Sequence, residues 1–205
     1  EAMAERFALP VVTYRPRYLS MATDHPMHLG FEPGELIKQA DVILTIESDV
    51  PWIPSLHTPN PEAKIIQLGI DPLYTKYPMR GFPCDLAITG SPTIVIPALT
   101  EALADREKAA IPRIDARRNR IAERHSKLRE GWAAKLESSR NGGPTDASWV
   151  AHCIDQVKGD DDIMVSESQL ALTNLVFRNP GTFFGTGPSG GLGWGTGAAL
   201  GVKLG

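Results

Sequence analysis

The sequence predicts an α/β protein, in which a Rossmann-like, doubly wound parallel sheet forms a central domain and a truncated second α/β domain follows. Short apolar runs alternate with helical segments along the first half of the chain, as in parallel sheets joined by crossover connections. These runs contain too many consecutive apolar residues for strands with one solvent-exposed face. A charged stretch without a strand pattern then separates the first half from another alternation of strands and helices.

The central domain is expected to contain four strands, one for each short apolar run. They cover residues 9–14, 41–47, 63–70 and 85–89. Helices are expected over residues 1–7, 34–40 and 91–104. The last of these has the clearest start, because Ser91 can cap the helix and Pro92 suits its first turn. Loops are expected over 15–33 and 51–62, where Pro and Gly interrupt the pattern.

Residues 106–144 are expected to form a helical linker that separates a central domain over 1–105 from a second domain over 145–205. The stretch is highly charged, and Asn141–Pro144 ends it with turn-forming residues. Its basic residues are interleaved with acidic ones, which is typical of a solvated helix face. The second domain is expected to contain helices and strands in alternation, namely a helix over 146–157, a strand over 162–166, a helix over 170–177, a strand over 182–184 and a final helix after a glycine-rich turn.

Charge and composition exclude several classes of partner. A formal net charge of −3 and a pI near 6.0 do not favour nucleic acid or an anionic membrane surface. The sequence also lacks an apolar run of the roughly 20 residues that a membrane-spanning helix needs. Cys84 and Cys153 lie far apart without metal-ligand partners, so we expect two buried thiols in a reducing, cytoplasmic compartment.

Both ends of the sequence interrupt a helical pattern. Residues 1–7 read as the middle of an amphipathic helix without an initiator methionine, and the chain stops within a glycine-rich helix at Gly205. We therefore expect the chain to be a fragment of a longer protein.

The glycine-rich stretch near the end can be interpreted in three ways. Residues 185–190 fit the pattern G-x-G-x-x-G between a strand and a helix. A dinucleotide fingerprint, however, opens the first βα unit and is followed by an acidic residue, whereas no Asp or Glu follows Arg178. The glycines can instead permit tight turns and close helix–sheet packing. In the third interpretation, the isolated bulky residue Leu192 supports a flat ligand while the bare backbone reaches its edge.

The order of several motifs resembles one enzyme family. The segment 187–205 reads GPSGGLGWGTGAALGVKLG and is similar to the start of the diphosphate-binding domain of thiamine diphosphate-dependent enzymes of the acetolactate synthase and benzoylformate decarboxylase group. Residues 166–169 and 178–181 precede it in the family's order. The first half resembles that family's central domain in four segments, 22–33, 40–54, 63–72 and 82–92. The resemblance thus covers nearly the whole chain.

The resemblance implies five cofactor-binding residues in this chain. Leu192 matches the bulky aliphatic residue over which the cofactor bends into a V shape. Gly190 matches the residue whose carbonyl accepts a hydrogen bond from the pyrimidine amino group, and Gly191 lies between these two positions. Ser168 and Gln169 match the loop that contributes donors to the diphosphate group.

The resemblance also implies a 2-oxo acid decarboxylase or carboligase that uses thiamine diphosphate and Mg²⁺ and forms a homodimer or homotetramer. In the family, the metal-binding Gly-Asp-Gly motif and Asn would lie beyond residue 205, and the activating Glu belongs to a partner's amino-terminal domain. We therefore expect no catalytic residue and no metal ligand here, and no activity of this chain alone. FAD is not expected, because residues 30–33 lack the family's flavin-binding Gly-Met-His-Gly segment.

Two alternatives remain open from the sequence. One is an enzyme of the 2-hydroxyacyl-CoA lyase or oxalyl-CoA decarboxylase type, in which the central domain binds a nucleotide. The other is a non-catalytic, Rossmann-like module that binds nucleotides or partners. We expect His25 and His28 to make local hydrogen bonds, Trp52 to pack in its loop, and both His57 and His125 to lie on the surface without partners.

Overall fold

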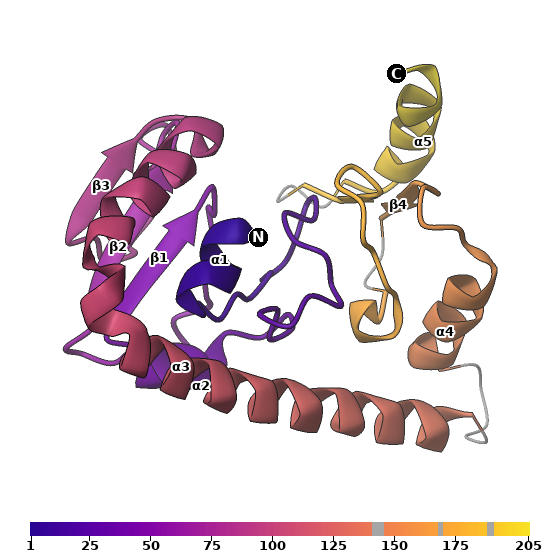
Figure 1. Ribbon diagram of the computed structural model, residues 1–205. Coiled ribbons are helices and arrows are strands. Elements are labelled where there is room, and N and C mark those ends of the chain that lie inside the picture. The colour runs from indigo at the N-terminus through magenta and orange to yellow at the C-terminus, as the bar shows by residue number, and fades with distance from the viewer. Residues whose placement is uncertain (141–145, 168–169, 188–190) are drawn as a thin grey trace. The chain divides into compact units, whose positions relative to one another are not determined.

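The computed structural model describes residues 1–140, 146–167, 170–187 and 191–205. It is a mixed α/β protein with two small parallel sheets and one long helix, which confirms the expected class (Figure 1). The chain folds into two compact units. One unit comprises Glu32–Arg113, and the other comprises Glu1–Phe31 together with Ile114–Gly205. The domain boundaries expected near residues 105 and 144 stay a prediction.

The unit Glu32–Arg113 contains a three-stranded parallel sheet. Its strands are β1 (Val42–Ile46), β2 (Lys64–Gly69) and β3 (Leu86–Thr89), in the order β1-β2-β3. Three of the four strands expected for the central domain are therefore confirmed. The strands follow one another in chain order, so this sheet lacks, in its described part, the reversal of strand order that defines a doubly wound fold.

One face of this sheet packs on a small core. Ile37 of α2 (Gly34–Gln39), Trp52 and Ile65 form a buried cluster. The side chains of Val42 and Leu86 are about half exposed (51% and 52%). The expectation of a sheet covered on both faces is therefore not met by the residues that the structure describes.

A single helix, α3 (Pro92–Ser139), replaces the two helices expected over 91–104 and 106–140. It contains Pro97 and Pro112 and continues through both. The residues between these two prolines are mostly Ala, Glu, Lys, Arg and Leu. These residues favour helix strongly enough to keep the segment continuous. Near its middle, Ile114 and Ile121 are buried.

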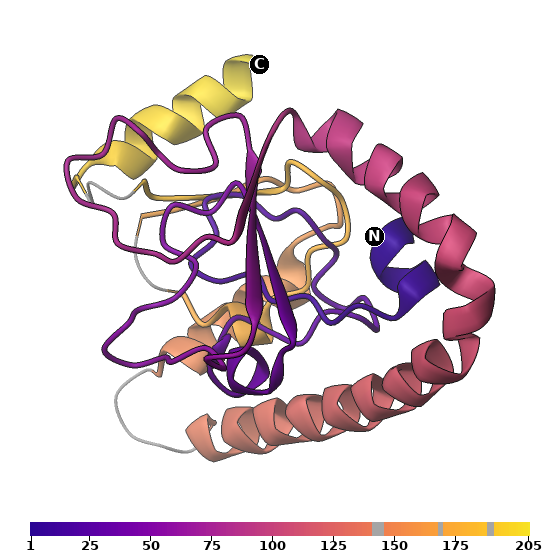
Figure 2. The same cartoon turned by 90° about the vertical axis from the view of Figure 1, so that its left-hand side faces the viewer.

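The amino-terminal helix α1 (Ala2–Phe7) lies beside α3 (Figure 2). Two arginines in the second half of α3 bind its carboxyl end. Arg117 donates from Nε to the carbonyl of Ala8 at 2.7 Å, and Arg118 donates to the carbonyl of Glu5 at 2.8 Å. Cations at the carbonyl end of a helix are favourable because they satisfy its free carbonyls and its dipole. The expectation of a solvated basic face is therefore wrong for these two residues.

The strand expected over residues 9–14 is also wrong. Val11 forms only an isolated parallel bridge with His28. Its amide donates to the carbonyl of Met27 at 2.9 Å, and the amide of Leu29 donates back to Val11 at 2.8 Å. Pro10 has no amide hydrogen for a ladder, and the following loop supplies the partners that a sheet would have provided.

His28, the bridge partner of Val11, is fully buried. Its Nε2 lies 3.0 Å from the hydroxyl of Thr13, while Nδ1 has no hydrogen-bond partner among the described residues. The imidazole contacts Phe31 edge-on at 5.2 Å, and Phe31 stacks on Trp132 of α3. Burial of the imidazole disfavours its charged form.

A two-stranded parallel sheet forms the other end of this unit. Its strands are β4 (Met164–Ser166) and β5 (Phe183–Gly185), and Met164 pairs with Phe183. Helix α4 (Ala147–Val157) precedes them, and the carboxylate of Asp146 caps it by accepting from the amide of Ser148. This helix and both strands agree with the expectation from sequence.

The helix expected over 170–177 is wrong, because only a 3₁₀ turn, η1 (Leu172–Asn174), forms there. The amide of Val176 donates to the carboxylate of Asp155 at 2.8 Å, and the amide of Phe177 donates to the hydroxyl of Thr23 at 3.0 Å. These side-chain acceptors replace the carbonyls that a helix would use. Tertiary contacts therefore override the helical pattern of the sequence.

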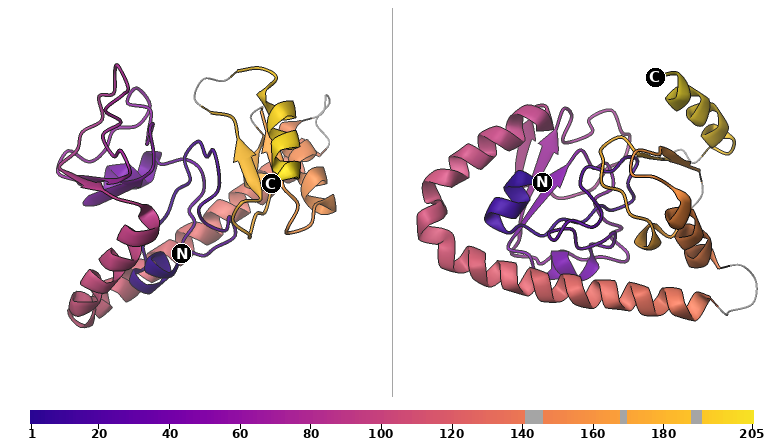
Figure 3. Two further views of the ribbon diagram at one scale, coloured as in Figure 1. Left: turned by 90° about the horizontal axis from the view of Figure 1, so that it is seen from above. Right: turned by 45° about the vertical axis from the view of Figure 1, so that its right-hand side comes forward.

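The core of this region consists of five buried apolar side chains, namely Leu19, Ala151, Leu175, Phe177 and Phe183. The final helix, α5 (Trp194–Leu204), packs beside β4 and has no buried residue among those described (Figure 3). The glycine-rich helix therefore contributes little to the core and contacts the small sheet at β4.

Prediction for His28. Burial, and to a smaller extent Arg129, lowers the pKa of His28 from 6.5 to about 4. The unfolded chain binds a proton below pH 6.5, whereas the folded chain does so only near pH 4. The contribution of His28 to the free energy of unfolding is therefore fully present above pH 6.5. It falls by roughly 3 kcal/mol as the pH falls to about 4.

Urea unfolding at pH 7.5, 6 and 5 measures this loss. The variant His28→Gln keeps a partner for Thr13 but does not titrate, so its stability should change less over the same range. Parallel curves for the two proteins would show that His28 is not the titrating group.

Candidate functional site

The candidate site lies at the carboxyl ends of β4 and β5. Because the two strands are parallel, the loops that follow them leave the sheet at the same edge. The amide of Thr186 donates to the carbonyl of Ser166 at 3.1 Å and joins the starts of the two loops. Open α/β sheets bind ligands at this edge.

The two loops are those that the sequence predicts to bind a cofactor. Gly191 and Leu192 lie within the described residues. Ser168, Gln169 and Gly190 lie outside them, so their predicted roles are not placed by the structure. Glu167 is the last described residue before the gap at 168–169, and its carboxylate contacts the second loop directly. The structure thus brings together two segments that the sequence separates by more than twenty residues.

Leu192 occupies the tip of a tight turn from Gly191 to Trp194. The amide of Trp194 donates to the carbonyl of Gly191 at 3.4 Å, and Gly193 has φ of 88° and ψ of −2°. These angles belong to the third position of a type II turn, where glycine is strongly preferred. Leu192 takes the second position, and its side chain is 96% exposed.

Glu167 anchors this turn to the first loop. One carboxylate oxygen accepts from the amide of Gly193 at 2.5 Å, and the other accepts from the amide of Gly195 at 2.7 Å. The hydrogen bonds from Gly195 and then Gly193 lower the pKa of Glu167 below its usual value. A carboxylate at the first amides of a helix is favourable because it satisfies free donors and the positive end of the dipole.

The glycines of this region have different structural reasons. A Cβ on Gly185 would lie 2.5 Å from the carbonyl oxygen of Pro16, and one on Gly195 would lie 3.0 Å from the Glu167 carboxylate. A Cβ on Gly191, Gly197 or Gly201 would meet no described atom within 4 Å. The first glycine of the G-x-G-x-x-G pattern is therefore explained by the approach of the 16–17 backbone, while three later glycines are not explained by protein packing.

These features fit the ring-bending part of a thiamine diphosphate site better than its diphosphate part. An exposed aliphatic side chain stands on a tight turn, and a Cβ on Gly191 would meet no described atom within 4 Å. The amides of Gly193 and Gly195, however, already bind the Glu167 carboxylate. A diphosphate group would therefore need donors other than these two amides.

The histidines outside this region make local contacts. Nδ1 of His25 accepts from the amide of Met27 at 3.1 Å, and His28 pairs with Thr13 as described above, so the expected local hydrogen bonds are confirmed. The expectation of unpartnered surface histidines is wrong. His57 accepts from the amide of Ile53 at 3.3 Å, and His125 lies 3.4 Å from Nε of Arg129. Burial and Arg129 lower the pKa of His125.

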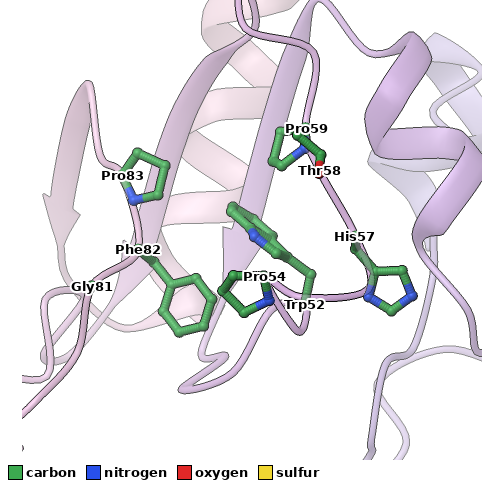
Figure 4. Close-up of a pocket in the computed structure, with 8 residues that line it drawn as sticks. All are labelled: Trp52, Pro54, His57, Thr58, Pro59, Gly81, Phe82 and Pro83. Atoms are coloured by element: carbon green, nitrogen blue, oxygen red, sulfur yellow. The ribbon is translucent and has the colours of Figure 1, made fainter.

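A shallow pocket of about 200 Å³ lies in the unit Glu32–Arg113 (Figure 4). Trp52 and Phe82 meet edge to face at 5.3 Å in its wall, and proline side chains surround them. Trp52 is 2% exposed and belongs to the core cluster of this unit. Its expected role in loop packing is therefore confirmed.

The described residues place limits on other sites. They contain no group of three or more His, Cys, Asp or Glu side chains arranged to hold a metal ion. None of the described helices is both long enough and apolar enough to span a membrane. Both cysteines are free thiols, but Cys153 is exposed and Cys84 is half-buried. The expectation of two buried cysteines is therefore wrong.

A comparison of the sequence with protein-family models finds no matching family, and a search of curated proteins finds no match either.

Prediction for the glycines of the turn and helix. Gly193→Ala should destabilise the turn by about 1 kcal/mol or more, because φ of 88° is unfavourable for a residue with a Cβ. Gly197→Ala should stabilise α5 by roughly 0.5–1 kcal/mol, because this position is helical and its Cβ would meet open space. Hydrogen exchange of the α5 amides measures both effects. Equal losses in the two variants would contradict the assignment of the turn.

Proposed function

We propose that this chain belongs to a thiamine diphosphate-dependent 2-oxo acid decarboxylase or carboligase similar to the acetolactate synthases. The observation that carries the proposal is the presentation of Leu192. An exposed leucine by itself is ordinary. Here it stands at the tip of a type II turn, flanked by glycines, at the carboxyl edge of a parallel strand pair. This combination suits a side chain that contacts a ligand.

The proposal assigns roles to the residues of the two loops. Leu192 would lie between the two rings of the cofactor and hold them in the bent arrangement. Gly190 and Gly191 would bring backbone polar groups to the pyrimidine edge without the hindrance of a Cβ. Ser168 and Gln169 would supply donors to the diphosphate. The amides of Gly193 and Gly195 take no part, because Glu167 already occupies them.

When bound, thiamine diphosphate supplies a carbon nucleophile that adds to the carbonyl of a 2-oxo acid and accepts the electron pair released with CO₂. The protein's task is to bind and orient the cofactor, which bending over Leu192 accomplishes. Mg²⁺ would be the second cofactor of the proposal, and as a hard cation it would take oxygen ligands. FAD is not part of the proposal.

The proposed function also implies a domain organisation and an oligomeric state. The sheet of β1, β2 and β3, whose strands follow chain order, would be part of a Rossmann-like central domain over 1–105, followed by the linker 106–144. Residues 145–205 would begin the diphosphate-binding domain. The complete enzyme would be a cytoplasmic homodimer or homotetramer.

Calorimetric titration of the full-length protein with thiamine diphosphate and Mg²⁺ tests the proposal. Saturable binding that depends on Mg²⁺ would support it, and the absence of any uptake would remove it. Parallel titrations with NAD, ADP, FAD and coenzyme A examine the alternatives. Micromolar binding of NAD without binding of thiamine diphosphate would favour a nucleotide-binding module. Turnover of coenzyme A thioesters would favour an enzyme of the 2-hydroxyacyl-CoA lyase or oxalyl-CoA decarboxylase type.

Prediction for Leu192. In the full-length protein, Leu192→Ala should reduce affinity for thiamine diphosphate roughly 10- to 100-fold, because the contact area of a leucine side chain is lost. The melting temperature should not change, because the side chain is 96% exposed without the cofactor. Leu200→Ala is the matched control, since Leu200 is also an exposed leucine but lies within α5, outside the turn that carries Leu192. Unchanged affinity in Leu192→Ala would exclude Leu192 from the site.

A further inference from the structure

Resting on the function proposed above, we propose that Glu167 is a positioning residue that holds Leu192 in place for the cofactor. Its carboxylate fixes the turn that carries Leu192. Glu167 does not itself need to touch the cofactor. It is not among the five cofactor-binding residues that the family resemblance implies.

The two hydrogen bonds of the Glu167 carboxylate lie directly after Leu192 in the chain. The amide of Gly193 belongs to the same peptide group as the carbonyl of Leu192. When the Glu167 carboxylate accepts from this amide at 2.5 Å, it fixes the plane of the peptide that follows Leu192. The second bond, from the amide of Gly195, fixes the first turn of α5 in the same frame.

Among the described residues, few other contacts hold the tip of the turn. The Leu192 side chain is 96% exposed, so packing does not restrain it. The described bond across the turn, from Trp194 to Gly191, is long at 3.4 Å. The bonds to Glu167 are shorter and involve an ionised acceptor, and such bonds are stronger than those between neutral groups. We therefore infer that Glu167 supplies the main restraint.

The paired hydrogen bonds to Gly193 and Gly195 require a glutamate at position 167. Two oxygens of one carboxylate accept from two amides that are two residues apart. A glutamine offers only one oxygen acceptor, and its NH₂ group would face an amide donor. An aspartate is one methylene shorter and would not span the same gap from the end of β4. The space is also restricted, because a Cβ on Gly195 would approach the carboxylate to 3.0 Å.

The other sheet provides a matched control residue. Glu47 follows β1 as Glu167 follows β4, and its carboxylate accepts from the amide of Ile70 at 2.8 Å. Glu47→Gln removes the negative charge at a strand end far from Leu192 in sequence, while the remaining side-chain oxygen can still accept from Ile70. It reports the general effect of neutralising such a carboxylate, without altering the anchor of the Leu192 turn.

The first experiment tests the anchor in this chain without cofactor. NMR amide signals of Gly193 and Gly195 should shift as the pH falls through the lowered pKa of Glu167. They should also shift in Glu167→Gln at neutral pH and remain unchanged in Glu47→Gln. The titration of the unaltered chain needs no variant to fold. Signals that do not respond to pH or to Glu167→Gln would overturn the anchor.

The second experiment tests the role toward the cofactor in the full-length protein. We expect Glu167→Gln to weaken thiamine diphosphate binding roughly tenfold and to slow deuterium exchange at the thiazolium carbon of the bound cofactor. If Glu167 acts through Leu192, the double variant with Leu192→Ala should lose no more than Leu192→Ala alone. Losses that add would show that Glu167 acts independently and would overturn the proposal.

The two experiments separate failure of this inference from failure of the proposed function. Absence of thiamine diphosphate binding by the unaltered protein would reject both the function and the role of Glu167 toward it, while the NMR experiment would still decide the anchor. Normal binding together with unresponsive Gly193 and Gly195 signals would reject the inference alone. Normal binding that Glu167→Gln does not weaken would do the same.

Discussion

The parallel pairing of β4 and β5 is the constraint on which the candidate site depends. It places the loop that begins at Glu167 beside the loop that begins at Thr186, because parallel strands end at a common edge. The Glu167 carboxylate then joins the second loop to the first. Without this pairing, Leu192 would be an exposed residue on an unsupported glycine-rich segment.

The same unit owes its assembly to polar contacts with backbone groups. Arg117 and Arg118 bind carbonyls at the end of α1, and Arg129 donates to the carbonyl of Thr23. Thr23 in turn accepts from the amide of Phe177. Residues 1–31 have little regular structure of their own, so their backbone groups must find partners on α3 and on the strand region. His28 is buried within this segment, and its lowered pKa predicts that acid destabilises the arrangement.

The unit Glu32–Arg113 has a buried polar network at its sheet. The amide group of Gln67 donates to the carbonyl of Pro83 at 2.9 Å and accepts from Arg80 at 2.7 Å. Arg80 also donates to the carbonyl of Asp49 and lies over the rings of Tyr74 and Phe82. This network ties together two long connections that contain no helix in their described residues. A satisfied buried network of this kind specifies one arrangement of the loops.

The sequence by itself determined the α/β class, the helix from residue 147, the strands β1 to β5 and the glycine-rich turn, because apolar runs, capping residues and glycines act locally. It also selected Leu192 as unusual. Only the tertiary structure decided that residues 9–14 and 170–177 are irregular and that Glu167 anchors the turn. In each of these cases the deciding hydrogen bond joins residues distant in the chain, and no local pattern encodes such a partner.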